Sequence, residues 1–479
     1  MPFQGSRNDL NSDLFSYSTP ISFACGTGFS IFQDVLLPAI LSAEEEIVLA
    51  TCFWANSKTR DELVKTLQLL SAQVTKANGL NKVQVYICFS SSSAAQKLFH
   101  TSSPDGHIYP SKDWNRKLGL PAPDEVPGLD ISVKSLFFRP FSVLHSKYLI
   151  IDRSEVYFPS CNVSWEDWYE CCIGFRGPIV KQVFEFWRDV WRPAKLVDHL
   201  TEQHCHEAHL ADKYGGNFES YQISFDGRPL RTTLLRHPHD SSLRQSLFFL
   251  PASNAPLPQT PLNTTLLRLI TGAKHEIVLL TPNLTSDIAI TALCHALKNG
   301  INVMLITNRR MMVPEQVVTA GIVTEQVVDK LIKAHGRGFE GRRMKKRFAR
   351  LAESLFEQKL HFDEHDGQND QSILQRVGRL QVSYFRRPDG VGTQTAEREL
   401  AFGAICDKSH IKLTMVDGRA MVLGSGNMDR ASWRTSQELG VLVEDEIETI
   451  HSTDTVMKIW RQVEQGLEGC LEHYFDSGR

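Results

Sequence analysis

The chain has 479 residues, of which 42% are hydrophobic and 22% charged, a composition typical of a folded protein with two or three domains. A formal net charge of −3 gives no overall attraction to nucleic acid, and no run approaches the roughly 18 consecutive apolar residues of a membrane span. The N-terminus lacks a secretory pattern and the ten cysteines have no regular spacing, so a reduced, cytoplasmic protein is expected.

The first predicted elements recur later in the chain. Residues 40–54 (ILSAEEEIVLATCFW) resemble residues 270–284 (ITGAKHEIVLLTPNL), and each copy is typical of a helix end followed by a buried strand. A helix pattern and a second apolar strand follow each copy, at 60–73 and 83–90 in the first and at 286–300 and 301–308 in the second. Strand, helix and strand with such apolar strands indicate a sheet covered on both faces.

A second repeated segment places polar residues within an apolar strand pattern. HSKYLIID at 145–152 corresponds to HIKLTMVD at 410–417, and an asparagine follows each aspartate by ten residues. The matched positions are His145 and His410, Lys147 and Lys412, Asp152 and Asp417, and Asn162 and Asn427. In a strand, the histidine and lysine of each pair would share one face.

The repeats predict an α/β fold of two duplicated units, each a central mixed β-sheet flanked by helices, with a pseudo-twofold axis between them. Similar amphipathic helices at 183–190 and 456–463 close the two units. We expect the first unit to span 1–215, with its motif at 145–170, and the second to span 216–479, with its motif at 410–438. The second unit carries about 35 extra residues, and we place a basic insertion at about 313–375.

A histidine-rich segment, HLTEQHCHEAHL, includes His199 and His209. It could hold a metal ion, but zinc ligands usually recur at tighter spacings from two separate elements. We favour a polar surface helix and predict no metal site.

The duplicated motif suits chemistry on a phosphate diester. Two imidazoles and two ammonium groups around one point could attack phosphorus, protonate the leaving oxygen and hold the equatorial oxygens. Ser160 and Ser425, with the two asparagines, are expected to face those oxygens. Glu170 and Glu438 could accept from a histidine Nδ1 and fix its tautomer. Asp152 and Asp417 belong to the motif but fall at the far end of the strand, where fixing a turn suits them better than direct catalysis.

The pattern H-x-K-x(4)-D-x(6)-G-S-x-N, present twice, resembles that of the phospholipase D superfamily, over about residues 25 to 465. It is especially similar to cardiolipin synthases and related phosphatidyltransferases. The first motif departs from the pattern, because Pro159 replaces the glycine and Glu170 follows Asn162 by eight residues, whereas Glu438 follows Asn427 by eleven.

The resemblance implies a phosphohistidine mechanism with no cofactor or catalytic metal, in which His145 is the nucleophile and His410 the acid and then the base. It also implies that the motif residues, including both aspartates, form the catalytic set, and that a monomer suffices for a complete site. A glycerophospholipid is the leading substrate, either hydrolysed or transferred to an alcohol. The alternative is a nucleic-acid phosphodiesterase of the same superfamily, which the acidic balance disfavours.

Residues 333–350 hold eight Lys or Arg and a single acid, Glu340. Met344, Phe348, Leu351 and Leu355 follow helical spacing. One interpretation is that residues 333–360 contact an anionic membrane peripherally. The other is that the apolar face packs on the protein itself while the basic face is solvated.

Overall fold

The computed structural model describes residues 15–77, 81–93, 106–138, 142–192, 221–223, 225–238, 257–339, 342–357, 377–386, 406–445 and 455–478. The histidine-rich segment at 199–209 and the predicted break near residue 215 lie outside these ranges.

The first half is built on a mixed sheet. Strands β2 (Glu46–Phe53), β3 (Val83–Ser91) and β5 (Leu129–Ser135) are parallel, and β8 (Tyr148–Ile151), β9 (Glu155–Pro159) and β10 (Tyr169–Arg176) continue the sheet beyond β2 in antiparallel order. The apolar runs of β2 and β3 are buried, as expected for strands covered on both faces. Short strands β4 (His107–Ile108), β6 (Phe137–Phe138) and β7 (Ser142–Val143) complete this half.

The second half repeats the same strand order. Strands β13 (Glu276–Leu280), β14 (Asn302–Asn308) and β15 (Leu380–Phe385) are parallel, and β16 (Leu413–Val416), β17 (Ala420–Gly424) and β18 (Glu438–Glu444) follow in antiparallel order beyond β13. An extra strand, β19 (Leu471–Asp476), pairs with β15 at the outer edge. The buried strands predicted at 83–90 and 301–308 are therefore confirmed as β3 and β14.

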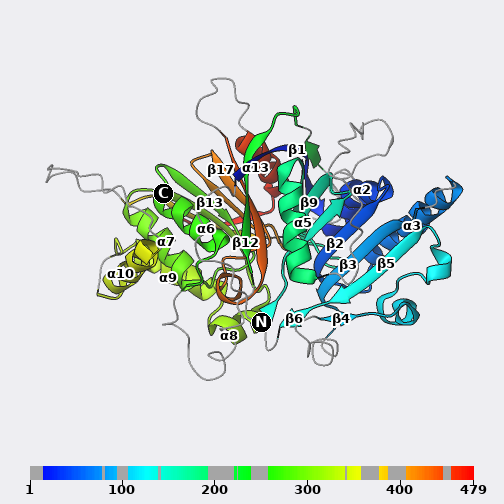
Figure 1. Ribbon diagram of the computed structural model, residues 1–479. Coiled ribbons are helices and arrows are strands. Elements are labelled where there is room, and N and C mark those ends of the chain that lie inside the picture. Colours follow the sequence, from blue (N-terminus) through cyan, green and yellow to red (C-terminus); the bar gives the residue numbers. More distant parts are fainter. Residues whose placement is uncertain are drawn as a thin grey trace, which may run out of the picture.

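Strand β1 (Phe15–Thr27) joins the halves into one large mixed sheet. Its first residues pair with β12 (Leu230–His237), which pairs with β18, and its later residues pair with β10 and with β11 (Tyr221–Ile223). Figure 1 shows this strand crossing between the two sets of strands.

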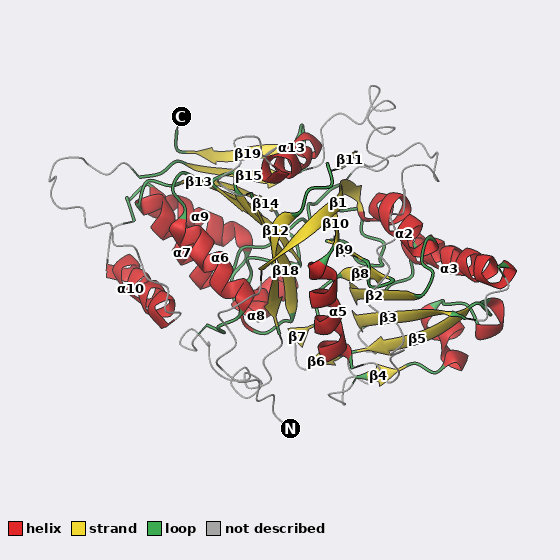
Figure 2. Cartoon of the chain, turned by 45° about the horizontal axis from the view of Figure 1, so that its top comes forward, coloured by secondary structure: helices red, strands yellow, loops and turns green. Residues whose placement is uncertain are grey.

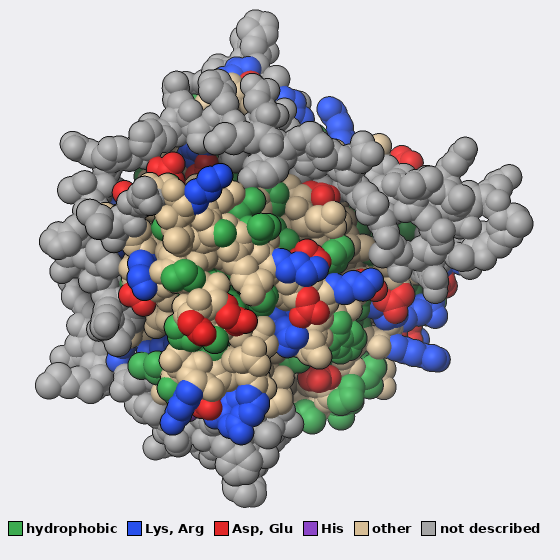
Figure 3. All heavy atoms as spheres, turned by 90° about the vertical axis from the view of Figure 1, so that its right-hand side faces the viewer, with side chains coloured by type: hydrophobic (Ala, Val, Ile, Leu, Met, Phe, Trp, Pro, Cys, Tyr) green, Lys and Arg blue, Asp and Glu red, His purple; other side chains and the backbone are tan. Residues whose placement is uncertain are grey.

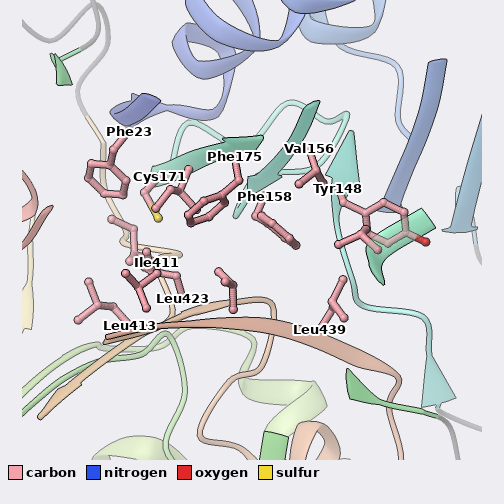
Figure 4. Close-up of a cluster of buried hydrophobic side chains, with 14 of the residues drawn as sticks. Phe23, Tyr148, Val156, Phe158, Cys171, Phe175, Ile411, Leu413, Leu423 and Leu439 are labelled. Carbon is pink, nitrogen blue, oxygen red and sulfur yellow. The ribbon is translucent and has the colours of Figure 1, made fainter. Parts of the chain in front are cut away.

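One hydrophobic core spans the two halves. Figure 4 shows the labelled side chains Tyr148, Phe158 and Phe175 facing Ile411, Leu413, Leu423 and Leu439. All seven are buried. Burial of apolar surface on both sides of the contact makes the relative position of the halves part of the folded core.

Helices cover the sheet on both faces (Figure 2). Helices α3 (Lys58–Lys76) and α7 (Asp287–Lys298) follow β2 and β13. Each begins at an N-cap serine, because the Ser57 hydroxyl accepts the Arg60 amide and the Ser286 hydroxyl accepts the Ala289 amide. Helix α5 (Pro178–Trp191) packs against both β1 and β12, and α13 (Thr455–Leu467) packs against β1. The remaining helical segments include α1 (Gly28–Ile31), α2 (Leu37–Leu41), α6 (Pro261–Gly272), α8 (Val313–Ala320), α9 (Thr324–His335), α10 (Arg342–Glu357) and α12 (Arg430–Arg434).

The two halves differ most between their second and third parallel strands. The connection from β3 to β5 has 37 residues (92–128), whereas that from β14 to β15 has 71 (309–379), which is 34 more. Helices α8, α9 and α10 lie in this longer connection.

Helix α10 carries the basic segment, and its apolar face is turned toward the protein. Leu351 is buried, and Met344 and Phe348 pack on the core of the second half. The Phe348 ring lies 5.7 Å from that of His295 on α7. Lys345, Lys346 and Arg350 are exposed. The interpretation in which the apolar face packs on the protein is therefore the one that the structure supports, although Leu355 and residues 358–360 lie outside the described side chains.

The face of the first half seen in Figure 3 has basic and acidic side chains intermingled rather than one field of a single sign. Among the described helices, none is both long and apolar enough to cross a membrane.

Candidate active site

The two motifs lie where the halves meet, and each is held by the opposite half. The His145 amide donates to the Gln437 carbonyl at 2.8 Å, and the His410 amide donates to the Tyr169 carbonyl at 2.8 Å. The strand predicted over the whole of 145–152 is shorter, since β8 begins only at Tyr148. The reason is that the backbone at the histidine pairs across the interface instead of within its own sheet.

The histidine side chains follow the same crossed arrangement. His145 Nδ1 lies 2.9 Å from Glu438 of the second half, and His410 Nδ1 lies 2.9 Å from Glu170 of the first half. With each Nδ1 occupied by a carboxylate, the Nε2 atoms remain for chemistry. The two imidazole centroids are 6.4 Å apart. Near-attack contacts of about 3–3.5 Å on either side would let a single phosphoryl group bridge the rings.

Strand register explains why Glu170 reaches its histidine despite the shorter loop. Pro159 pairs with Cys172 in the first half, and Gly424 pairs with Gly440 in the second. Each glutamate stands two residues before that pair, so it occupies the same strand position whatever the loop length. The departures at Pro159 and in the Asn–Glu spacing therefore leave the placement of the glutamate unchanged.

The serines support the glutamates instead of facing the space between the histidines. Ser160 donates to Glu170 and accepts the Cys171 amide, while Ser425 donates to Glu438 at 2.5 Å and accepts the Leu439 amide. The expectation that these hydroxyls point at substrate oxygens is not what the structure shows, because each lies between its glutamate and a backbone amide.

The asparagines lie beside the motif with different partners. The Asn162 side-chain oxygen accepts the Phe53 amide at 3.3 Å, so its amide nitrogen is the group that could donate to a substrate. Asn427 donates to Asp429 at 3.0 Å, and its own oxygen is buried without a partner in the described part of the chain. Neither arrangement places the asparagine against a histidine.

The lysines are buried cations beside the histidines. Lys147 and Lys412 are 3% and 4% exposed, and each ammonium donates to the carbonyl of its own histidine, at 2.8 and 2.6 Å. An ammonium has three donors, so two remain on each lysine for a bound phosphate. Burial, opposed by Glu170, lowers the pKa of Lys412 to about 7.

The two His–Glu pairs differ in their protonation. Burial acts to raise the pKa of Glu438, but His145 and hydrogen bonds from Ser425 and Ser432 hold that pKa below its usual value. The ionised carboxylate can only accept, so the proton of neutral His145 stays on Nδ1 and Nε2 keeps its lone pair. Burial also lowers the pKa of His145, which favours the neutral ring.

The Glu170–His410 pair keeps a proton more readily. Burial raises the pKa of Glu170 to about 7, against the opposing effect of Lys412. Burial, with Lys412 and Lys147 nearby, holds the pKa of His410 well below its usual value. Near neutral pH this pair can therefore hold one additional proton, and transfer within the pair makes it available at His410 Nε2.

Asp152 and Asp417 lie away from the histidines. About 3.3 Å of rise per residue over the five residues from Lys147 places Asp152 at the opposite end of β8. Its carboxylate accepts the amides of residues 44, 45 and 46, and Asp417 accepts those of residues 274, 275 and 276. Both have positive φ, of 50° and 52°, in the turn after their strand. The geometry supports fixing of the turn, not contact with a reacting phosphate.

Some residues of the site carried no signal in the sequence. Ser432 donates to Glu438 at 2.7 Å, and the Trp168 ring lies 4.8 Å from that of His410. Ser146 donates to the Gln437 side chain at 2.9 Å. Position within the motif loops was the available clue, but nothing in the local pattern distinguishes these residues from ordinary loop residues.

No group of His, Cys, Asp or Glu side chains in the described ranges is arranged to hold a metal ion. This statement does not extend to the histidine-rich segment at 199–209, which those ranges omit.

Comparisons with known proteins identify a domain in the second half of the chain. Residues 266–460 match the family model described as "Cardiolipin synthase, PLD-like domain". This part of the chain therefore contains a phospholipase D-like domain, which implies an enzyme, a phosphodiesterase or a transferase. No curated protein sequence matches the chain.

Among solved structures, the fold is similar to phosphatidylserine synthase from Haemophilus influenzae Rd KW20, with 13% identity and a TM-score of 0.52. The match covers 95% of this chain and 89% of that one. Polyphosphate kinase from Porphyromonas gingivalis matches at 10% identity and a TM-score of 0.42, over 92% and 50% of the two chains. NucT from Helicobacter pylori matches at 12% identity and a TM-score of 0.24, over 50% and 97%.

Proposed function

We propose that the protein is a phosphodiesterase or phosphatidyltransferase that acts on glycerophospholipids through a phosphohistidine intermediate. The crossed His145–Glu438 and His410–Glu170 pairs, each beside a buried lysine, are the observation that carries this proposal. The matching strand order supports two duplicated units, 1–215 and 216–479, related by a pseudo-twofold axis with the active site between them.

In the first step His145 Nε2 attacks phosphorus and the bond from phosphorus to the leaving oxygen breaks. His410 Nε2 gives its proton to that oxygen, which departs as an alcohol. Lys147 and Lys412 stabilise the charge that builds on the equatorial oxygens. In the second step His410 takes the proton of water or an acceptor alcohol, whose oxygen attacks phosphorus and releases His145. Protonation fits these roles, because Glu438 stays ionised while the Glu170–His410 pair can hold a proton near neutral pH.

A lipid substrate is supported by large apolar side chains exposed near the motifs. Trp165, between Asn162 and Glu170, is 65% exposed. On α8, Val317 and Val318 are 52% and 61% exposed, whereas Gln316 is the buried residue of that helix. The strand before α8 ends at Asn308, which binds the backbone of Ser409 next to His410. Apolar groups around a site favour a membrane-borne substrate over a nucleic acid. The similarity to a phosphatidylserine synthase supports the same choice at the level of the fold.

A substrate panel tests this function. Fluorescent phosphatidylcholine, phosphatidylglycerol and single-stranded DNA would each be offered with and without a primary alcohol. We expect turnover of at least one phospholipid, and an alcohol adduct would identify a transferase. His145→Ala and His410→Ala should each lose at least about 10²–10⁴-fold in rate, with their fold checked by circular dichroism. Cleavage of DNA with no lipid turnover would contradict the proposal and favour the nuclease alternative.

A further inference from the structure

A cavity of about 230 Å³ lies in the second half, between α7, α9 and α10 and beside α12. Its apolar wall includes Ile290, Val327, Leu331 and Met344. Helices α9 and α10 belong to the connection that is 34 residues longer than its counterpart in the first half. Protein interiors are normally close-packed, so an apolar space of this size suits a ligand better than it suits packing.

Basic side chains also line this cavity. Lys330, Arg347 and Arg430 line it, and Asp287 is the acidic residue of the lining. The Asp287 carboxylate lies 3.8 Å from the guanidinium of Arg434. Within the described residues, neither Arg347 nor Arg430 forms an ion pair with a carboxylate. The N-terminus of α7, at Asp287, adds the positive end of a helix dipole.

We propose that this cavity binds an anionic single-chain amphiphile, an alkyl or acyl chain with a carboxylate or phosphate head. The chain lies against Ile290, Val327, Leu331 and Met344, and the head pairs with Arg347 and Arg430. The cavity matches both parts of such a ligand: its apolar wall suits the chain, and its cations, which lack a carboxylate partner there, suit the head. A carboxylate and a phosphate can each accept hydrogen bonds from a guanidinium, so the proposal defines the ligand by its anionic head and apolar chain.

The cavity is a different site from the one between the histidines, but it adjoins the second motif. Arg430 follows Asp429, which accepts from Asn427 at 3.0 Å. The Arg430 amide donates to Thr285, which also lines the cavity. A bound head group therefore contacts the loop that carries Asn427. Binding itself needs neither His145 nor His410, so it does not depend on the proposed function.

Binding would be measured by calorimetry on the full chain carrying His410→Asn, so that no turnover occurs. The probes are decanoate and decyl phosphate, which differ in their head, and decyltrimethylammonium, decanol and inorganic phosphate as controls. We expect both anionic amphiphiles to bind more tightly than the cation, the alcohol or the free ion. Decanoate and decyl phosphate together show whether the site discriminates between a fatty-acid head and a phospholipid-like head.

Variants locate the binding. Arg347→Gln should weaken both anionic amphiphiles by roughly tenfold or more, because a charge-assisted hydrogen bond is lost. Arg350→Gln, an exposed position on the same helix, is the matched control and should bind as the parent does. Met344→Trp should fill the cavity and abolish binding, with Ile322→Trp as a substitute if it does not fold. Equal affinity for the cationic amphiphile, or parental affinity in Arg347→Gln and Met344→Trp, would overturn the proposal.

Discussion

The crossed glutamates predict that a residue of the second half controls the nucleophile of the first. Glu438 is fully buried and accepts from His145 at 2.9 Å, Ser425 at 2.5 Å and Ser432 at 2.7 Å. Glu438→Gln keeps the shape but replaces one acceptor oxygen with an N–H donor. Loss of a hydrogen bond to a charged group costs about 1.5–3 kcal/mol, or roughly 10- to 150-fold. A wrong histidine tautomer can raise the loss to about 10⁴-fold, as for the aspartate of a serine-protease triad.

We therefore expect Glu438→Gln to slow phosphohistidine formation on His145 by about 10²–10⁴-fold with little change in KM. Rapid-quench trapping of labelled phosphoenzyme measures that step, and ¹⁵N NMR of the imidazole reports the tautomer. Glu444→Gln, near the other end of β18, is the control and should leave the rate unchanged. Phosphoenzyme formation at the parental rate in a folded Glu438→Gln protein would refute the orienting role.

Further predictions concern pH, metal, the turn and the basic face. Glu170, with a pKa raised to about 7, and Lys412, with a pKa lowered to about 7, both lose a proton as pH rises, so kcat/KM should fall through about pH 7. Glu170→Gln should remove the Glu170 contribution to that limb and leave the contribution of Lys412. Chelators should leave the rate of the chemical step unchanged; inhibition reversed by added zinc would contradict this. Asp152→Asn weakens the hydrogen bonds that three backbone amides donate to the carboxylate at 2.7–2.9 Å. It should lower the free energy of unfolding by about 1–3 kcal/mol, measured by thermal unfolding, yet leave the folded enzyme active. Changing Lys345, Lys346 and Arg350 to Gln should weaken binding to anionic vesicles by about 3 kcal/mol if that face docks electrostatically, and equal binding at low salt would exclude such docking.

The buried strands and the motif positions were predictable because both are local patterns in the sequence. Apolar runs such as 83–90 and 301–308 could be assigned from periodicity, and the internal repeat alone is enough to relate His145 to His410. The crossing of the glutamates could not be predicted. It depends on side-chain contacts between residues 293 and 240 positions apart, and motif spacing is the same whether a glutamate serves its own half or the other.

Tertiary packing decided the features on which the sequence was ambiguous or misleading. The apolar stripe of α10 has the same spacing for a membrane helix and for a packed one, and the packing of Met344, Phe348 and Leu351 on the second half is what distinguishes them. Ser160 and Ser425 looked like phosphate ligands because they stand beside the asparagines. Their hydroxyls instead complete the hydrogen bonding of buried glutamates, which an isolated carboxylate in the core would otherwise lack.

The exchange of glutamates makes the two halves chemically interdependent. If the halves separated by even a few ångströms, both imidazoles would lose their carboxylates together, so the site would switch off as a unit instead of becoming half active. A substitution that removes the Glu170 carboxylate affects His410, which lies on the far side of the interface. Selection that preserves the function of either histidine therefore constrains residues in both halves. Expressed separately, each half would hold a histidine with no carboxylate partner, and mixing the two fragments should restore activity only when they dock.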